Sequence, residues 1–312
     1  CLRAIGGGSA LSSKTSSVAP QARQAPQPTA VTTSVSLRDL RRVGARPPFL
    51  DYLVSLWDYR HFIYYDAQAR VQTGNEQDRL GRVWLVLGPL LNGLMFYLIM
   101  GVILKSGSGI DNFVAFLIIG VFLFQMSTRA ITASSRVINA NKNVIHAFQF
   151  PRASLVLAAN LRELLSNIPV LITMLILIIV LPPSEEITWR WLLIIPIVAL
   201  QFAFNLGVGL ILARVVSVFN DASQLISYAM RLWMYGSCMF YSIERFNDMP
   251  VVKTIMEYNP LYNVLDLARE TLLYGSAGEW RSWVILALWS IAALAVGTVV
   301  FWRGEETYGR EL

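Results

Sequence analysis

The chain has 312 residues, of which 55% are hydrophobic and only 15% charged, with a formal net charge of +6. Soluble domains carry roughly a quarter charged residues, so this composition excludes an ordinary soluble protein. No basic stripe alternates with aromatic residues in a polar segment, which argues against nucleic acid as the partner of the excess positive charge.

Residues 1–45 are rich in Ser, Thr, Ala, Pro, Gln and Gly and show no apolar period. Such a segment cannot bury enough apolar surface to offset the entropy lost on ordering. We therefore expect a disordered cytoplasmic tail.

Residues 46–82 form the next predicted unit, an amphipathic helix in the membrane interface followed by a link. Aromatic residues such as Trp57 and Tyr64 alternate here with charged ones such as Asp58 and Arg60. The mixture is too polar to span a bilayer and places aromatic rings at headgroup depth. A soluble helix packed on a partner is the alternative.

Six apolar blocks then make up a transmembrane domain over 83–302. Each block can cover the roughly 30 Å hydrocarbon core at about 1.5 Å per residue. The predicted fold is therefore an all-α integral membrane protein with six transmembrane helices. The blocks are 83–104, 112–134, 155–181, 191–213, 222–243 and 283–302.

Basic residues predict the orientation of these helices. Arg and Lys gather before the first span, between the second and third, after the fourth and after the sixth. The positive-inside rule makes that side cytoplasmic, so both termini, including the tail 303–312, are expected inside. The long segment 244–281 is then outside. Within it, residues 261–274 show a helical period that begins at Asn259-Pro260, which predicts a short amphipathic helix against the outer membrane face.

Signatures of catalysis and of metal binding are missing from the sequence. There is no phosphate-binding loop, no zinc-protease motif and no serine elbow. The only two histidines, His61 and His146, are far apart, as are Cys1 and Cys238. We therefore expect no catalytic residue, no metal site and no cofactor on this chain.

The fifth span carries a polar stripe at steps of three and four residues. A charged Arg231 inside a span would cost about 2.5–3.5 kcal/mol facing lipid, so the stripe should face protein or water. The stripe either contacts another helix or subunit, or forms the wall of a polar pathway. The two interpretations are compatible if the pathway lies at the seam of a dimer. The stripe comprises Asp221, Gln224, Tyr228, Arg231, Tyr235, Cys238 and Ser242.

Two other spans show weaker patterns. Trp84, Asn92 and Phe96 share a face of the first span, together with Gly88. Gln201, Asn205 and Gly209 line one side of the fourth, which is typical of close packing through polar and small residues.

The inner loop 136–152 is polar and helical in tendency up to Pro151. A short helix parallel to the membrane would project its polar side chains into the cytoplasm, whereas an ordinary connecting loop would not. The projecting residues would be Asn139, Asn141, Lys142, Asn143 and His146.

Several motifs, in this order, give the chain a family resemblance. They are Trp57-Asp58-Tyr59-Arg60, Leu80-Gly81 before Trp84, Gly88-Pro89-Leu90, Phe150-Pro151-Arg152, Asn259-Pro260-Leu261 with Arg269, and Phe301-Trp302-Arg303 before Tyr308-Gly309-Arg310. Taken together the chain resembles permease subunits of type-two ABC exporters, in the branch that moves O-antigen, teichoic acid or galactan. Within that branch the chain most resembles the mycobacterial cell-wall galactan exporters.

The resemblance implies a homodimer in the bacterial inner membrane, each chain docking one separate ATPase that binds ATP and Mg²⁺. A lipid-linked polysaccharide would leave through a channel at the dimer seam. The channel would be lined by Trp84, Asn92, Phe96, Tyr228, Arg231, Tyr235 and Ser242. The five polar residues of loop 136–152 would couple to the ATPase, and Asn259, Pro260, Asp266 and Arg269 would belong to an outer gate.

Two other functions share parts of this pattern. A type-two ABC permease for drugs or lipids would show the same topology. A membrane-embedded transferase would need a charged cluster in one leaflet, for which the sequence offers only Arg129, Arg136 and Glu163.

Overall fold

The computed structural model describes residues 47–73, 83–104, 110, 112–148, 150–182 and 185–308, without the side chains of 85 and 86. All of them belong to one unit, which spans 43–312. The predicted tail 1–45, the link residues 74–82 and the last four residues lie outside the described ranges. The described residues form helices and no strand.

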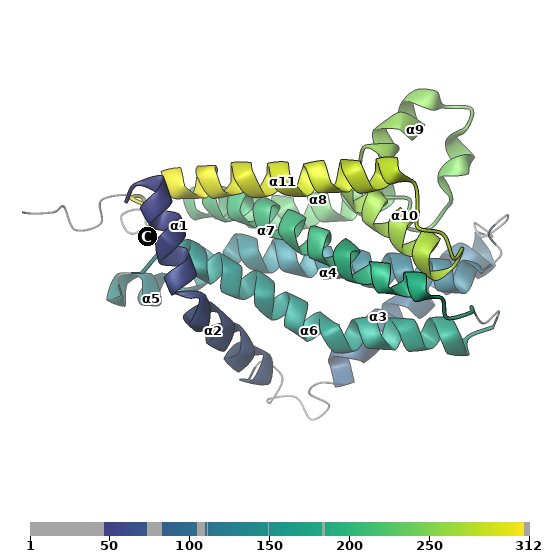
Figure 1. Cartoon of the computed structure of the whole chain (residues 1–312), viewed down its shortest axis with the longest axis horizontal. Coiled ribbons are helices and arrows are strands. Elements are labelled where there is room, and N and C mark those ends of the chain that lie inside the picture. Colours follow the sequence, from purple (N-terminus) through teal and green to yellow (C-terminus); the bar gives the residue numbers. More distant parts are fainter. Residues whose placement is uncertain are drawn as a thin grey trace, which may run out of the picture. The chain divides into compact units, whose positions relative to one another are not determined.

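Four of the helices are long and apolar enough to cross a membrane. They are α4 (Phe113–Ala140), α6 (Ala153–Val180), α7 (Ile194–Val218) extended by the 3₁₀ turn η2 (Trp189–Leu193), and α11 (Trp280–Arg303). Figure 1 shows them running along the long axis of the view. They confirm the second, third, fourth and sixth predicted spans as helices.

The first and fifth predicted spans are shaped differently. The first forms α3 (Val83–Phe96), which continues as the π-helix η1 (Tyr97–Ile103). The fifth forms α8 (Ala222–Gly236), which has 15 residues and not the 22 expected. A helix of that length covers only about 22 Å at 1.5 Å per residue. The prediction of a helix through residue 243 is therefore wrong.

Shorter helices complete the described chain. At the N-terminal side, α1 (Phe49–Asp58) and α2 (Arg60–Thr73) replace the single interfacial helix that the sequence predicted, with a break at Tyr59. The remaining ones are α5 (Lys142–Ala147), η3 (Ile243–Phe246), α9 (Pro250–Glu257) and α10 (Pro260–Leu272). Figure 1 places α1 and α5 at one end of the bundle and α9 and α10 at the other.

Helix α4 is the centre of the bundle and packs against α3, α6, α7, α8 and α10. The Asn112 side chain caps its start by accepting a hydrogen bond from the Ala115 backbone N–H at 3.1 Å. Gln201 of α7 donates to the Leu123 carbonyl and to the Ser127 hydroxyl of α4, both at 2.8 Å. These bonds confirm that the polar side of the fourth span is a packing face.

Small residues allow α7 and α11 to touch along their backbones. A Cβ atom placed on Gly297 would lie 2.3 Å from the Gly207 carbonyl oxygen. Gly209 packs equally closely on α4, because its Cβ would lie 2.6 Å from that of Ser134. Close approach of this kind is how helices associate where lipid removes the hydrophobic driving force.

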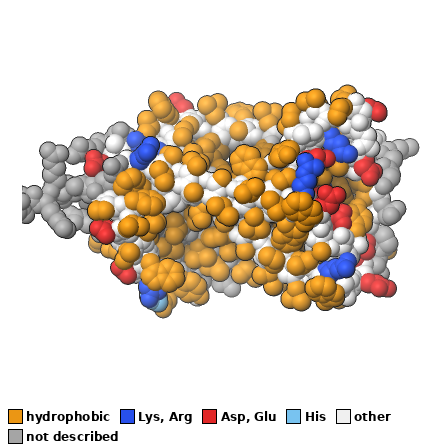
Figure 2. Space-filling model, turned by 45° about the horizontal axis from the view of Figure 1, so that its top comes forward, with side chains coloured by type: hydrophobic (Ala, Val, Ile, Leu, Met, Phe, Trp, Pro, Cys, Tyr) orange, Lys and Arg blue, Asp and Glu red, His pale blue; other side chains and the backbone are white. Residues whose placement is uncertain are grey.

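The outer surface of the bundle has the character of a lipid-facing protein. Figure 2 shows hydrophobic side chains over the middle of one face, with most Lys, Arg, Asp and Glu side chains toward its two ends. Exposed apolar residues include Ile172, Ile176, Leu288 and Ile291 on α6 and α11. Which end faces the cytoplasm stays a prediction from the positive-inside rule.

Candidate functional site

Helix α8 presents most of its surface outward. It buries only Ile226 and Met230, while Leu225 and Leu232 are 70% and 74% exposed. Its opposite flank packs lightly on α4 and α7. The helix is therefore a wall of the bundle that the described part of the chain leaves uncovered.

Three residues of the predicted stripe lie on that uncovered wall. Tyr228 and Tyr235 are 61% and 52% exposed. The Arg231 guanidinium carbon sits 5.6 Å from the centre of the Tyr228 ring. No carboxylate among the described residues pairs with Arg231, so this cation has only a ring beside it, an arrangement that stabilises it weakly when exposed.

Aromatic contacts join α8 to the first span. The Phe240 ring lies 4.7 Å from Phe96 of α3 and 6.0 Å from Tyr235 of α8, measured between ring centres. Phe96 and Tyr235, both predicted to line the channel, thus both contact Phe240, which the sequence analysis did not single out. Trp84 and Asn92 are exposed on α3.

The far end of the predicted stripe is not part of the helix. Cys238 follows the end of α8 with a φ of 50° and is buried. Ser242 is the N-cap of η3, and its hydroxyl accepts a hydrogen bond from the Glu244 N–H at 3.3 Å. The turn at Cys238 breaks the period, so the expectation of one continuous stripe to Ser242 is wrong.

Asn259 connects the end of α8 to the start of α10. Its Oδ1 accepts from the Leu261 N–H at 3.1 Å, which caps α10, and from the Trp233 indole N–H at 2.8 Å. Its Nδ2 donates to the Gly236 carbonyl at 2.9 Å. The predicted helix start at Asn259-Pro260 is confirmed, and the same side chain also holds the last turn of α8.

The sequence predicted that the helix after Asn259 lies on the membrane surface. This prediction is wrong, because α10 is buried in the bundle. Eleven of its residues are buried, Arg269 among them, and it packs against α4, α7 and α11. Asp266 accepts hydrogen bonds from the Tyr262 hydroxyl at 3.2 Å and the Ser282 hydroxyl at 3.4 Å. The carboxylate therefore ties α10 to the start of α11.

Arg269 holds the chain reversal after α8. Its guanidinium donates to the carbonyls of Cys238 and Met239, each at 3.0 Å, and more weakly to that of Phe116 at 3.4 Å. It also lies over the Phe116 ring, 3.4 Å from its centre. Asn259, Asp266 and Arg269 thus anchor the segment that we predicted to be an outer gate, and the gating role itself stays a prediction.

Helix α5 is the short helix predicted in the inner loop, but it presents fewer residues than expected. Asn143 and His146 are exposed, and Lys142 is partly exposed. Asn139 is the next-to-last residue of α4 and donates to the Val216 carbonyl at 3.1 Å and the Asn220 side chain at 3.0 Å. Asn141 is buried and donates to the Val137 carbonyl at 2.7 Å. The projection of Asn139 and Asn141 into solvent is therefore wrong.

A cluster near the α5 end was not found from the sequence. The Tyr52 hydroxyl of α1 donates to Glu305 Oε2 at 3.0 Å, and the Arg152 backbone N–H donates to Oε1 at 3.0 Å. The Arg152 guanidinium also donates to the Glu305 carbonyl. Glu305 is only 7% exposed. Arg152 belongs to the Phe-Pro-Arg motif, which was the one available signal.

The surroundings of this cluster raise the pKa values of Glu305 and Tyr52. Burial raises the pKa of the Glu305 carboxyl, and the bonds from Arg152 and Tyr52 oppose that rise. Burial, then the adjacent Glu305 charge, raises the pKa of the Tyr52 phenol far above its usual value. Tyr52 therefore stays a hydrogen-bond donor at every physiological pH.

Replacing Tyr52 by Phe is expected to destabilise the fold by about 1–3 kcal/mol, the cost of leaving a buried polar group without its partner. The thermal unfolding temperature of the purified protein in nanodiscs measures this. Tyr59→Phe is the matched control, because no hydrogen bond involves its hydroxyl in the described residues. Equal unfolding temperatures for the two variants would contradict the assignment.

The comparisons with known proteins agree on one family. Residues 74–273 match the ABC-2 type transporter family. The chain is 28% identical over 227 residues to the O-antigen export system permease protein RfbA of Klebsiella pneumoniae, covering 71% of this chain and 83% of that protein. It is 20% identical over 260 residues to a Myxococcus xanthus protein of the same name, covering 82% and 97%. It is 24% identical over 228 residues to the polysialic acid transport protein KpsM of Escherichia coli, covering 73% and 87%.

Proposed function

Because the chain belongs to the ABC-2 type transporter family, we propose that it is the transmembrane subunit of an ATP-driven polysaccharide exporter. The cargo is a lipid-linked polymer, galactan or an O-antigen-like chain, carried from the cytoplasm to the outer face of the bacterial inner membrane. The names of the similar proteins, O-antigen permeases and a polysialic acid transporter, support a polysaccharide over a drug or a small lipid.

The motor of this exporter is a separate chain. The lack of a phosphate-binding loop in these 312 residues supports a proposal in which ATP and Mg²⁺ are bound by two ATPase subunits, one for each permease. The exposed residues of α5 and the residue after it offer a contact surface at one end of the bundle. These are Asn143, His146 and Phe148, the last 67% exposed.

The observation that carries the proposal is the uncovered wall of α8. It combines exposed Leu225 and Leu232 with Arg231 and two tyrosines. The exposed leucines suit contact with lipid or protein, whereas a charged Arg231 facing lipid would be costly. A second copy of the chain that covers the leucines and leaves Arg231, Tyr228 and Tyr235 facing a polar pathway resolves both features. We therefore place the channel at a homodimer seam, with α3 contributing Trp84, Asn92 and Phe96.

Depletion of the protein in its host tests the function. We expect polyprenyl-linked polymer to accumulate inside the cell while the surface polymer declines, and re-expression of the chain to reverse both changes. Normal surface polymer after depletion would contradict the substrate assignment. ATPase stimulation in the reconstituted complex, by polymer or by small amphiphiles, separates the exporter from a drug or lipid permease.

Arg231→Leu is expected to lower export in the depleted host on the order of tenfold, the equivalent of one contact worth 1.4 kcal/mol. Assembly of the dimer and basal ATP hydrolysis should stay near normal, because Arg231 makes no ion pair within the described chain. Radiolabelled polymer at the surface measures the loss. Arg231→Lys, which retains the charge, is the control. Loss of the dimer itself would identify the stripe as a packing contact only.

A further inference from the structure

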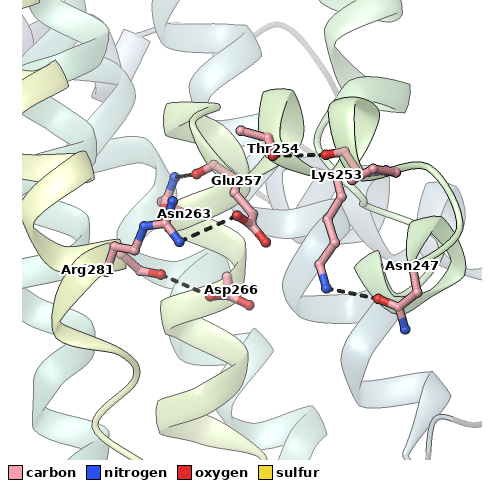
Figure 3. Close-up of polar contacts among 9 residues, drawn as sticks. Asn247, Lys253, Thr254, Glu257, Asn263, Asp266 and Arg281 are labelled. Atoms are coloured by element: carbon pink, nitrogen blue, oxygen red, sulfur yellow. Dashed lines mark hydrogen bonds and ion pairs between the residues drawn. The ribbon is translucent and has the colours of Figure 1, made fainter.

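A polar pocket opens among the short helices at the α10 end of the molecule. Its volume is about 530 Å³, and its walls come from η3, α9, α10, the turn after α10 and the first residues of α11. Pockets that bind small ligands measure about 300–1,000 Å³. Figure 3 shows residues of its wall and rim, including Glu257, Asn263, Asp266 and Arg281.

Negative charge dominates the wall of this pocket. Five carboxylates line it against two cations, Lys253 and Arg281. Arg281 faces Glu257 at 3.7 Å, and Lys253 donates to Asn247 at 2.9 Å, so both cations are already engaged. The lining carboxylates are those of Glu244, Glu257, Asp266, Glu270 and Glu279.

Several acceptors in the wall have no protein partner. The carboxylates of Glu244 and Glu270 form no hydrogen bond or ion pair with any described residue. Asn263 is only 1% exposed and lines the pocket. Its Nδ2 donates to the carbonyls of Glu257 and Asn259, both at 2.8 Å, while its Oδ1 accepts no hydrogen bond from the described residues. A buried amide held in this way presents a fixed acceptor to a ligand.

This set of atoms selects for a ligand rich in hydroxyl donors. A sugar hydroxyl donates one hydrogen bond, and bonds to a carboxylate are stronger than those between neutral groups. Arg281 and Lys253 each use one contact within the wall, and their remaining N–H donors can bond to sugar oxygens. An acidic sugar would meet like charges, which a binding site uses to reject a wrong partner. Among the described residues, no group of three or more His, Cys, Asp or Glu side chains is arranged to hold a metal ion.

We propose that this pocket binds an uncharged segment of the exported glycan as it emerges, and that it disfavours polyanionic polymers. The proposal rests on the proposed function, since it takes the cargo to be a polysaccharide. It adds that the cargo of this chain carries few or no acidic sugars along the part that meets the pocket.

Binding of defined oligosaccharides to the full-length protein in nanodiscs tests the proposal. The probes are a neutral galactotetraose, tetrasialic acid and the polyamine spermine, measured by saturation-transfer NMR. We expect galactotetraose to bind at least about tenfold more tightly than tetrasialic acid. The double variant Glu244→Ala/Glu270→Ala should weaken galactotetraose binding about tenfold, as expected for losing charge-assisted hydrogen bonds.

Glu186→Ala is the matched control, because Glu186 is an exposed acid outside the pocket. Unchanged thermal unfolding shows that each variant is folded. Tighter binding of tetrasialic acid, binding of spermine alone, or galactotetraose binding that the double variant leaves intact would each overturn the pocket. The depletion experiment measures export independently of this pocket. If depletion made polymer accumulate inside the cell as expected, but galactotetraose did not bind, the pocket would be rejected and the exporter function retained.

Discussion

Arg269→Leu is expected to unfold the segment between α8 and α11 and to abolish export. The substitution leaves the carbonyls of Cys238 and Met239 without donors in a buried site, and it removes the cation stacked on Phe116. Each orphaned buried acceptor costs about 1–3 kcal/mol, so the total loss is several kcal/mol. Limited proteolysis in nanodiscs should show new cleavage in residues 237–249, and the unfolding temperature should fall.

Arg269→Lys separates charge from geometry. Lysine retains the cation but lacks the planar fork that reaches two carbonyls at once, so we expect an intermediate loss of stability. Arg245 is an exposed arginine of the same segment between α8 and α11, and its replacement by Leu should leave the protein behaving as wild type. If Arg269→Leu gave the same cleavage pattern as the wild-type protein, the buried guanidinium would not be what holds the turn.

Gly207→Ala is expected to separate α7 from α11 and to destabilise the bundle by about 3 kcal/mol, the upper end of the cost of overpacking. The added Cβ would lie 2.3 Å from the backbone carbon of Ala293. A backbone atom cannot rotate away as a flexible side chain can, so the two helices must shift as units. Thermal unfolding of purified protein and the yield of membrane-inserted protein measure the effect.

Gly88→Ala is the control for helix propensity. A Cβ on Gly88 would meet nothing within 4 Å, and alanine in a helix interior is about 1 kcal/mol more favourable than glycine. We expect this variant to be as stable as wild type or slightly more so. If Gly207→Ala were equally stable, the close approach of α7 and α11 would not be essential for packing.

The sequence was sufficient to predict the long helices of the bundle and insufficient to predict the segment between α8 and α11. Hydropathy located the four long helices to within a few residues, except where α4 and α7 continue five or six residues beyond the apolar block. It could not find the end of α8, because Met239, Phe240 and Tyr241 extend the apolar run past the turn. That turn is set by the backbone at Cys238 and by Asn259, which contacts Gly236 from more than twenty residues away.

Charge misled the interpretation of α10 for a related reason. The helical period of 261–274 was expected to give an amphipathic helix against the membrane face. The Arg269 charge is instead satisfied by backbone carbonyls of another segment, and a sequence pattern does not record backbone partners. The Tyr52–Glu305 cluster was not found because it joins residues that are far apart in the sequence. The helix start at Asn259-Pro260 was found because its signal is local.

The cluster of Tyr52, Arg152 and Glu305 has a consequence for how the protein is made. The hydrogen bond from Tyr52 to Glu305 joins residues 253 positions apart, and the Trp302 indole N–H donates to the Pro47 carbonyl across a similar interval. A ribosome delivers α1 early, but the hydrogen bonds of α1 are complete only when Glu305, which follows α11, has been synthesised. Helix α1 can pack on α6 and α7 first, and it gains its last hydrogen bonds only after α11 has been made. A product that stopped before α11 would lack both bonds, so we expect α1 to be held less firmly in it and to be cleaved more readily by proteases.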